Sequence, residues 1–508
     1  MRKDSGPARP IRRVLIANRG EIAIRVARAC RELGIGSVAV FSEADVHAPH
    51  VEAADMAVAI GPAAAAESYL RIEALIGAAR RSGADAVHPG YGFLAESAAF
   101  ASAVLDAGLT WIGPPPETQA ALGNKLAARR AAVDAGVPVV PGLMVPLEDG
   151  VPPDLGMIGL PAMLKAAAGG GGRGMRRIDR ADELPDALAA ARREATVAFG
   201  DGTIYVERLV SPARHVEVQL LGDRQGNLAC LGERDCSIQR RHQKLVEESP
   251  SPAVTSDIRH ALYDSARRVA GTVPFDNAAT VEFLLDGEGN HYFLEMNTRL
   301  QVEHGVTELV TGLDLVAWQI RIAAGEPLPT AVLDPELRGN AVEVRIYAED
   351  PWSGFRPLGG TVSAWSLPSG PGVRVDAAAR PGLELTPEYD PLLGKLMVHA
   401  EDRGAMVARL RRALDETLVG GLQTDLGFHR WLVDQPGFVA GTYDTGFVPD
   451  HWADGPPLTD EEADVAAAAA AMARANLARD GAARPVREPS PAADSAWAAA
   501  ARRGALRS

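Results

Sequence analysis

Apolar runs alternate with helical patterns along the first part of the chain. Residues 11–18 (IRRVLIAN) predict a strand, residues 21–33 predict a helix and residues 37–41 predict a second strand. This alternation continues to about residue 113 and is typical of an α/β layer built on a parallel sheet. The turn after the first strand, residues 18–20, is not a GxGxxG fingerprint, so a dinucleotide-binding role is not expected.

The pattern changes after the GPPPET punctuation at residues 113–118. The middle of the chain mixes strands and helices in the manner of an α+β domain. Its predicted helices cover residues 124–135 and 256–272, and its first predicted strands cover residues 204–209 and 215–221. We expect the basic stretch over residues 233–250 to form a loop.

Short strand patterns dominate from about residue 339, so the third region is predicted to be rich in β-structure. The strands cover residues 341–348, 360–367 and 394–400, and a helix is predicted over residues 404–418. Past Trp452 the composition changes again. Residues 459–462 form a capping box before an Ala-rich helix, and the Pro, Ala, Arg and Ser residues that follow have little to bury. We interpret this end as a helical appendage and a mobile tail.

Two strand patterns separated by a turn place two acids opposite each other. Residues 280–285 (TVEFLL) and 291–297 (HYFLEMN) predict a hairpin whose turn is residues 286–290 (DGEGN). If this turn is centred on Glu288-Gly289, Glu282 lies opposite Glu295. Like charges directly across a strand pair are destabilising, so a cation is expected between them. Carboxylates and substrate phosphates are typical Mg²⁺ ligands, which indicates a Mg-nucleotide site. A solvated hairpin in another register is the alternative.

The second strand pattern continues to Glu303. Every second residue from Glu295 is polar or charged, and the residues between them are mostly apolar. One face of this strand would carry Glu295, Asn297, Arg299, Gln301 and Glu303. Two acids, a guanidinium and two amides on one face indicate a binding site, and an ordinary solvent-facing strand is the alternative.

Four consecutive glycines lie in the segment KAAAGGGGRGM, residues 165–175. Glycines bury nothing in a core, but they let main-chain N–H groups approach phosphate oxygens. The GxxxxGK[ST] signature is absent from this segment. We expect a mobile lid over the ATP phosphates, with Lys165 and Lys125 as candidate phosphate ligands. A flexible linker is the alternative.

Cationic and amide side chains crowd the stretch ERDCSIQRRHQKLVEESP, residues 233–250. Within six positions it contains Gln239, Arg240, Arg241, His242 and Lys244. In an acidic protein, beside a metal-nucleotide site, these residues suggest a local anion trap, whereas a solvated charged loop is the alternative. Arg345, in the strand pattern AVEVRIYAED, would join the anion trap if its face turned toward it, and would otherwise form a surface ion pair.

The length, net charge and cysteine content of the chain limit the classes of protein to which it can belong. A chain of 508 residues exceeds one ordinary core, so several domains are expected. The net charge of −14 disfavours nucleic acid as a partner. The three cysteines have no metal-ligand spacing and are consistent with a reducing compartment. Because no signal-peptide pattern and no apolar run of membrane-spanning length occurs, we expect a cytoplasmic protein with no membrane partner.

Seven motifs together resemble the biotin carboxylase family of ATP-grasp enzymes, in particular the biotin carboxylase part of acyl-CoA carboxylase α-subunits. They occur in family order and read IANRGEIAIR (16–25), HPGYGFLAE (88–96), KAAAGGGGRGM (165–175), ERDCSIQRRHQK (233–244), EMNTRLQVEHGVTE (295–308), AVEVRIYAEDP (341–351) and YDPLLGKL (389–396). The resemblance implies a Rossmann-like N-terminal domain over residues 10–123, an ATP-grasp domain over 124–338 with a mobile lid at about 140–210, and a β-rich C-terminal domain over 339–455. The Ala-rich end would cover residues 456–508.

The resemblance also implies a role for each matching residue. ATP would be bound by Lys125, Lys165, Gly169, Gly170, Gly171, Gly172, Gly174, Glu207, His215, Gln239 and His242. Mg²⁺ or Mn²⁺ would be bound by Glu282, Glu295 and Asn297. Bicarbonate would be bound by Lys244, Arg299, Gln301 and the main chain of Val302. Glu303 would be the general base, and Arg345 would stabilise the enolate form of biotin.

The implied reaction converts ATP, bicarbonate and biotin on a carrier into carboxybiotin, ADP and phosphate through carboxyphosphate. None of the ten methionines is followed by Lys, so biotin is expected on a separate biotin carboxyl carrier protein. The other expected partner is a carboxyltransferase subunit, and a homodimer or larger complex is expected. The sequence leaves the acyl-CoA open.

Three positions depart from the common family pattern. Arg208 stands where Lys is frequent, Gly305 where Pro is frequent and Asn340 where His is frequent. Arg208 puts ATP affinity in doubt, but none of the three removes a catalytic residue. The alternatives to a biotin carboxylase are another ATP-grasp carboxylate–amine ligase and a non-catalytic scaffold relative.

Overall fold

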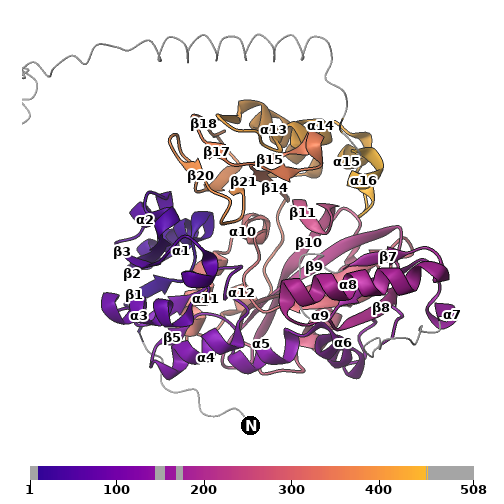
Figure 1. Cartoon of the computed structure of the whole chain (residues 1–508), viewed down its shortest axis with the longest axis horizontal. Coiled ribbons are helices and arrows are strands. Elements are labelled where there is room, and N and C mark those ends of the chain that lie inside the picture. The colour runs from indigo at the N-terminus through magenta and orange to yellow at the C-terminus, as the bar shows by residue number, and fades with distance from the viewer. Residues whose placement is uncertain (1–9, 144–154, 168–174, 453–454, 456–508) are drawn as a thin grey trace, which may run out of the picture. The chain divides into compact units, whose positions relative to one another are not determined.

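The computed structural model describes residues 10–143, 155–167, 175–452 and 455 (Figure 1). These residues belong to one compact unit, and the second unit, residues 456–508, lies outside the described residues. The predicted Ala-rich helix and tail therefore stay a prediction.

A five-stranded parallel sheet forms the N-terminal region (indigo in Figure 1). Its strands are β1 (Arg13–Ile16), β2 (Gly36–Ser42), β3 (Met56–Gly61), β4 (Ala86–His88) and β5 (Thr110–Trp111), in the order β3-β2-β1-β4-β5. Its helices are α1 (Gly20–Glu32), α2 (Pro49–Ala53), α3 (Ile72–Ser82), α4 (Ala98–Asp106) and α5 (Pro116–Leu122). The side chains of Val14, Leu15 and Ile16 are fully buried because helices cover both faces of the sheet. This is the predicted doubly wound α/β layer.

A small antiparallel sheet follows in the chain. It contains β6 (Ala162–Ala166), β7 (Arg176–Ile178) and β8 (Ile204–Arg208), in the order β7-β6-β8. The neighbouring helices are α6 (Lys125–Asp134), α7 (Leu155–Ile158) and α8 (Leu184–Phe199). Residues of β6, β8 and α8 share one buried cluster, so this sheet has its own core.

An eight-stranded antiparallel sheet joins the middle and C-terminal regions. Its order is β13 (His291–Asn297), β12 (Asn277–Asp286), β9 (Ala213–Gly222), β10 (Leu228–Arg240), β11 (Gln243–Ser249), β14 (Asn340–Tyr347), β21 (Leu392–Ala400) and β19 (Val373–Ala377). Strand β11 pairs with β14, so the sheet is continuous across the predicted boundary at residue 339. Side chains from both regions therefore meet on one sheet face.

The remaining elements cover this sheet or extend the C-terminal region. Helices of the middle region are α9 (Ser256–Ala270), α10 (His304–Thr311), α11 (Leu315–Ala323) and α12 (Thr330–Leu333). The C-terminal helices are α13 (Arg403–Glu416), α14 (Leu426–Leu432), α15 (Pro436–Ala440) and α16 (Phe447–His451). Short strands are β15 (Glu349–Asp350), β16 (Arg356–Pro357), β17 (Gly360–Thr361), β18 (Ala364–Ser366), β20 (Glu384–Leu385) and β22 (Leu418–Gly420).

Two predictions of local structure were wrong. The basic stretch 233–250 is not a loop, because strands β10 and β11 occupy most of it. Their two-residue turn, Arg241-His242, has positive φ at both residues (48° and 66°), as a tight turn between twisted strands requires. The predicted strand from Glu295 to Glu303 ends at Asn297, and the residues after it form an irregular segment that leads into α10.

Candidate active site

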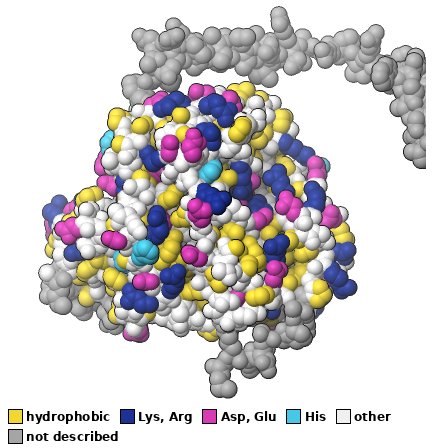
Figure 2. Space-filling view, turned by 180° about the vertical axis from the view of Figure 1, so that it is seen from behind, with side chains coloured by type: hydrophobic (Ala, Val, Ile, Leu, Met, Phe, Trp, Pro, Cys, Tyr) yellow, Lys and Arg dark blue, Asp and Glu magenta, His cyan; other side chains and the backbone are white. Residues whose placement is uncertain are grey.

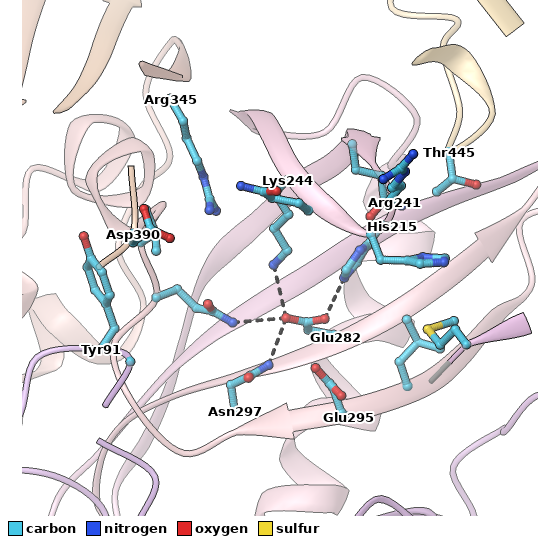
Figure 3. A pocket seen from close by; sticks show the side chains of 18 of the residues that line it. Tyr91, His215, Arg241, Lys244, Glu282, Glu295, Asn297, Arg345, Asp390 and Thr445 are labelled. Carbon is cyan, nitrogen blue, oxygen red and sulfur yellow. Dashed lines mark hydrogen bonds and ion pairs between the residues drawn. The ribbon is translucent and has the colours of Figure 1, made fainter. Parts of the chain in front are cut away.

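A cavity of about 1320 Å³ lies where the three regions meet. Its walls come from the turn after β1, from strands of the small and large sheets, and from the C-terminal residues 388–392 and 445–449. Figure 3 shows Glu282 inside this cavity, with Lys244, His215 and Asn297 pointing toward it and Glu295 beside it.

The two opposed acids lie as predicted. Glu282 on β12 pairs directly with Glu295 on β13, although the next pair is Phe283 with Phe293. Leu294 is therefore an extra residue, a β-bulge that shifts the register next to the acids. Without this bulge the turn would place Leu294 opposite Glu282. The prediction that Glu282 lies opposite Glu295 was correct. The turn was expected to centre between Glu288 and Gly289, whereas the pairing of Phe283 with Phe293 centres it on Glu288.

The Glu282 carboxylate accepts four hydrogen bonds from surrounding side chains. They come from His215 Nε2 at 2.7 Å, Asn297 Nδ2 at 2.9 Å, Lys244 Nζ at 3.1 Å and Gln301 Nε2 at 3.1 Å. Burial alone would raise the pKa of Glu282, but the charges of Lys244 and His215 hold it well below the usual value. Glu295 forms an ion pair with Lys125 from the start of α6. Glu282 is thus ionised, and both acids face cations.

The donor set around these acids suits a hard divalent cation. Carboxylate oxygens of Glu282 and Glu295 and the amide oxygen of Asn297 are the oxygen ligands that Mg²⁺ prefers. Glu217 on β9 lies directly opposite Glu282 and forms with His215 a group whose ligand atoms lie within 4.8 Å of one another. These residues could therefore hold a metal ion together with substrate phosphates.

Glu303 is fully buried between two cations. Lys244 Nζ lies 2.6 Å from Glu303 Oε1, and Arg345 Nη2 lies 3.0 Å from Glu303 Oε2. Burial alone would raise the pKa of Glu303, but Lys244, Arg345 and Arg234 hold it well below its usual value. The carboxylate is therefore ionised, and it can accept a proton from a ligand bound beside it.

Arg345 links Glu303 to a second buried acid. Its guanidinium contacts Glu247 on β11, with Nη2 at 2.5 Å from Oε1, as well as Glu303. The strand face of Arg345 thus turns toward the predicted anion trap, and the residue is not a surface ion pair. Burial raises the pKa of Glu247 to about 7, despite the charge of Arg345.

The irregular segment after β13 brings the other predicted anion ligands together. Arg299 donates to Gln301 Oε1 at 2.8 Å and to Asn297 Oδ1 at 3.0 Å. It also forms an ion pair with Glu96, at 3.0 Å from Nε to Oε2. The alternation expected of a strand does not apply here. Side-chain hydrogen bonds, and not strand geometry, hold these residues beside Glu282.

The predicted ATP ligands Lys125 and His215 contact Glu295 and Glu282, and the other described ATP ligands also line the cavity. Lys165 on β6 and Arg129 on α6 both pair with Glu207 on β8, at 2.6 Å and 2.7 Å. Gln239 and His242 also line the cavity. Burial and the charges of Lys165 and His215 lower the pKa of His242 to about 4, so its imidazole is neutral. The predicted glycine lid, Gly169 to Gly174, lies outside the described residues.

Sequence reasoning missed several residues that complete this site. Arg234 on β10 is fully buried and contacts Glu217 Oε1 at 2.5 Å, and Glu247 contacts Arg345. Both missed residues lie in the stretch 233–250, which we had read as a loop. The signal that could have found them is the register of the large sheet, which places Glu217 opposite Arg234.

The cations of this site are internal and do not belong to a basic outer surface. On the face in Figure 2, basic and acidic side chains are intermixed without a large area of one sign. Among the described residues no helix is long and apolar enough to span a membrane. The cysteines Cys30, Cys230 and Cys236 are buried and form no disulfide bond.

A parallel N-terminal sheet, a small antiparallel sheet, and a large sheet with paired acids and buried cations together define an ATP-grasp ligase. Three families match the chain. They are "Biotin carboxylase, N-terminal domain" over residues 10–119, "Carbamoyl-phosphate synthase L chain, ATP binding domain" over residues 124–331 and "Biotin carboxylase C-terminal domain" over residues 343–450. The chain belongs to the biotin carboxylase family.

Relatives of known function agree with this assignment. A biotin carboxylase of Halalkalibacterium halodurans is 49% identical over 87% of this chain and 98% of its own length. The mitochondrial methylcrotonoyl-CoA carboxylase subunit alpha of Mus musculus is 45% identical over 89% of this chain and 64% of its own length. The chain thus covers about two thirds of that subunit.

Solved structures share the fold. The biotin carboxylase of Campylobacter jejuni, in complex with a β,γ-ATP ligand, has a TM-score of 0.84 and 42% identity, over 87% of this chain and 99% of that one. The biotin carboxylase domain dimer of Hydrogenobacter thermophilus 2-oxoglutarate carboxylase, with MgADP, ADP and bicarbonate, has a TM-score of 0.84 and 43% identity, over 87% and 98%.

Proposed function

We propose that this chain is the biotin carboxylase subunit of an acyl-CoA carboxylase, which uses ATP and bicarbonate to carboxylate biotin on a separate carrier protein. The observation that carries the proposal is the buried Glu303 carboxylate, held ionised between Lys244 and Arg345 beside the opposed acids. Bicarbonate is a weak nucleophile, so its activation needs a base, cations and a phosphoryl donor in one place.

Bicarbonate binds in the anion trap formed by Lys244, Arg299, Gln301 and the main chain of Val302. Lys244 already contacts Glu303, so an anion bound to its ammonium lies within reach of the base. Glu303 takes the bicarbonate proton, and the resulting dianion attacks the γ-phosphate of ATP to give carboxyphosphate. Lys244 and Arg299 stabilise the negative charge that accumulates during this transfer.

ATP binds on the wall that carries Lys125, Lys165, Glu207, His215, Gln239 and His242, with the glycine segment 169–174 as its lid. Lys125 lies against Glu295, and Lys165 lies against Glu207, so the two ammonium groups are held on the wall that faces the cavity. Glu282, Glu295 and Asn297 hold Mg²⁺ or Mn²⁺, which when bound neutralises phosphate charge and orients the γ-phosphate.

Arg345 acts in the second half of the reaction. Carboxyphosphate breaks down to carbon dioxide and phosphate, and carbon dioxide then carboxylates the N1′ nitrogen of biotin. The phosphate released from carboxyphosphate takes the proton of this nitrogen, the ureido oxygen of biotin becomes negative, and the guanidinium of Arg345 stabilises that enolate. Its position beside Glu303 keeps both half-reactions in one cavity, where exclusion of water protects carboxyphosphate.

The assembly that we propose contains a biotin carboxyl carrier protein and a carboxyltransferase subunit. The α-subunit of a methylcrotonoyl-CoA carboxylase is a relative, which supports an acyl-CoA carboxylase. A homodimer is supported by the dimeric state of the Hydrogenobacter domain. The domain boundaries at residues 123, 338 and 455 and the cytoplasmic location belong to the same proposal.

Substitution of the base tests this function. Glu303→Gln keeps the size of the side chain but removes its basicity, so biotin- and bicarbonate-dependent ATP hydrolysis should fall by about 10²–10⁴-fold. The dissociation constant of Mg-ATP, measured by calorimetry, should change by less than about three-fold because Glu303 pairs with Lys244 and Arg345, whereas the ATP ligands Lys125 and Lys165 pair with Glu295 and Glu207. A variant that retains normal turnover would refute the role of Glu303.

A further inference from the structure

Two residues of the family motifs have no part in the proposed reaction, yet both hold the main chain of the anion trap. His304 Nδ1 lies 2.8 Å from the carbonyl oxygen of Gln301, and Lys395 Nζ donates a hydrogen bond to the carbonyl oxygen of Val302. We propose that His304 and Lys395 are positioning residues that fix two consecutive peptide planes and thereby aim Val302 N–H and the Glu303 side chain at bicarbonate. The inference rests on the proposed function, because it assigns these residues to the bicarbonate step.

Peptide geometry connects each carbonyl to the group that it positions. A trans peptide is planar, and its N–H points away from its C=O. The carbonyl of Gln301 shares a peptide plane with the N–H of Val302. When His304 holds that carbonyl on one side, the N–H of Val302 must point to the other side, and Val302 lines the cavity. The next plane, fixed by Lys395, ends at the Cα atom of Glu303.

The irregular course of this segment makes such anchors necessary. Residues 298–303 belong to neither strand β13 nor helix α10, so no sheet ladder holds the carbonyls of Gln301 and Val302. Buried carbonyl groups outside regular structure need partners from the main chain, from side chains or from water, and the main chain gives the Gln301 carbonyl a long hydrogen bond, from His304 N at 3.4 Å. His304 and Lys395 are both fully buried and supply these partners.

The protonation state of His304 follows from its surroundings. Burial and the nearby charges of Lys395 and Arg25 hold the pKa of His304 well below its usual value, so the ring is neutral. A neutral imidazole has one N–H, and a carbonyl oxygen only accepts. The proton is therefore on Nδ1, where it is donated to Gln301.

Lys395 connects the anion trap to two other parts of the molecule. On β21 it stands directly opposite Arg345 of β14, so its backbone is fixed relative to the cation that pairs with Glu303. Its ammonium also lies 3.4 Å from Glu21 of α1 and 3.9 Å from Glu343. A buried ammonium carries a desolvation penalty that an apolar side chain would avoid, so packing alone does not explain a lysine here.

A matched pair of variants at His304 tests the proposal. Asn places its amide nitrogen at the position of Nδ1, whereas Gln places it one bond further out. In a biotin-dependent ATP hydrolysis assay, His304→Gln should raise the KM for bicarbonate about ten-fold or more, because a lost buried hydrogen bond corresponds to roughly that factor. The KM for Mg-ATP should stay within about two-fold, and His304→Asn should restore the bicarbonate KM to within about three-fold of the wild-type value.

A remote buried histidine provides the control. His50 Nε2 lies 3.2 Å from the carbonyl oxygen of Val40 in the N-terminal sheet and does not line the cavity. His50→Asn removes this hydrogen bond, because its amide nitrogen does not reach the position of Nε2, so it should lower the melting temperature and leave the bicarbonate KM unchanged. Lys395→Met is the second test variant, and it should also raise the bicarbonate KM more than the Mg-ATP KM.

The possible results separate this proposal from the proposed function. If the wild-type chain shows no bicarbonate- and biotin-dependent ATP hydrolysis, the function itself is wrong and the positioning role falls with it. If the wild-type chain is active but His304→Gln changes both KM values equally, or leaves both unchanged, only the positioning role is refuted. It is likewise refuted if His304→Asn is as impaired as His304→Gln, or if neither His304→Gln nor Lys395→Met folds.

Discussion

Three buried acids of the site each contact at least one cation, and Lys244 contacts all three. Glu282 contacts Lys244, Glu303 contacts both Lys244 and Arg345, and Glu217 contacts Arg234. Removing one partner of such a pair leaves an uncompensated buried charge, which is strongly destabilising. The charges nevertheless suit a site that must admit an anion and phosphates. The charges that stabilise the ligands are in position before the ligands bind, so the site needs little reorganisation on binding.

Arg345 should matter more for carboxyl transfer than for ATP binding. Arg345→Ala removes the cation beside the biotin oxygen, so carboxybiotin formation should fall by about 10²–10³-fold, while the Mg-ATP dissociation constant changes by less than about three-fold. Rates of carboxybiotin formation and calorimetric titration measure the two effects. Arg345→Lys is the control, because it keeps the charge but cannot contact Glu247 and Glu303 with one planar fork. Equal losses in both measurements would contradict the assignment.

Glu349 should make the protein less stable as pH rises. Burial and the charge of Asp425 raise its pKa to about 7 from the model-peptide value of 4.5. Between these values the folded protein holds a proton that the unfolded chain has lost. The stability contribution of Glu349 is therefore complete below pH 4.5 and is lost as pH rises to 7.

Glu349→Gln removes this titration. The free energy of unfolding of the variant, relative to the wild type, should increase between pH 5 and pH 8, and urea unfolding at several pH values measures it. A constant difference across this range would show that Glu349 titrates normally.

At the scale of elements, the hairpin of β12 and β13 and its β-bulge position the two opposed acids. The period-two pattern predicted β13 with its observed bounds, because its apolar residues pack on the core. It could not locate the bulge at Leu294, and it failed for the segment after Asn297. The basic stretch was wrongly read as a loop because a strand buried with paired charges resembles a solvated segment in sequence.

Helix α10 packs closely against β21 at Gly305. A Cβ atom at this position would overlap the Sδ of Met397, whose side chain is fully buried. Gly305→Ala should therefore lower the free energy of unfolding by about 1–2 kcal/mol, the overpacking penalty of ~1–3 kcal/mol exceeding the helix-propensity gain of ~1 kcal/mol. Chemical denaturation measures this change.

A double-mutant cycle gives the control. Val lacks the Sδ atom, so Gly305→Ala should be less destabilising in a Met397→Val background than in the wild type. Equal effects in both backgrounds would mean that Met397 is not the obstacle.

At the scale of the whole molecule, one sheet carries residues from distant parts of the chain. Lys244 and Arg345 are a hundred residues apart and meet because β11 pairs with β14. Among the described residues, the last buried aromatic one is Trp452, which packs with Phe428, Trp431 and Trp352.

A chain truncated after residue 455 should keep the described core. Its melting temperature should lie within about 2 °C of the full-length value, because the truncation removes no described packing contact. ATP hydrolysis with free biotin should be unchanged, and affinity for a biotinylated carrier measures whether residues 456–508 form a docking element. Loss of activity with free biotin would contradict this division.

The sequence by itself determined the family, the alternation of strands and helices in the N-terminal region, and most chemical groups of the site. These follow from local periodicity and from motifs that occur within short stretches. Only the tertiary structure decided which groups meet: Arg345 with Glu303, Arg234 with Glu217, and Lys395 with Val302. The physical reason is that pairing register, bulges and burial depend on contacts between residues far apart in the chain, and no local pattern records them.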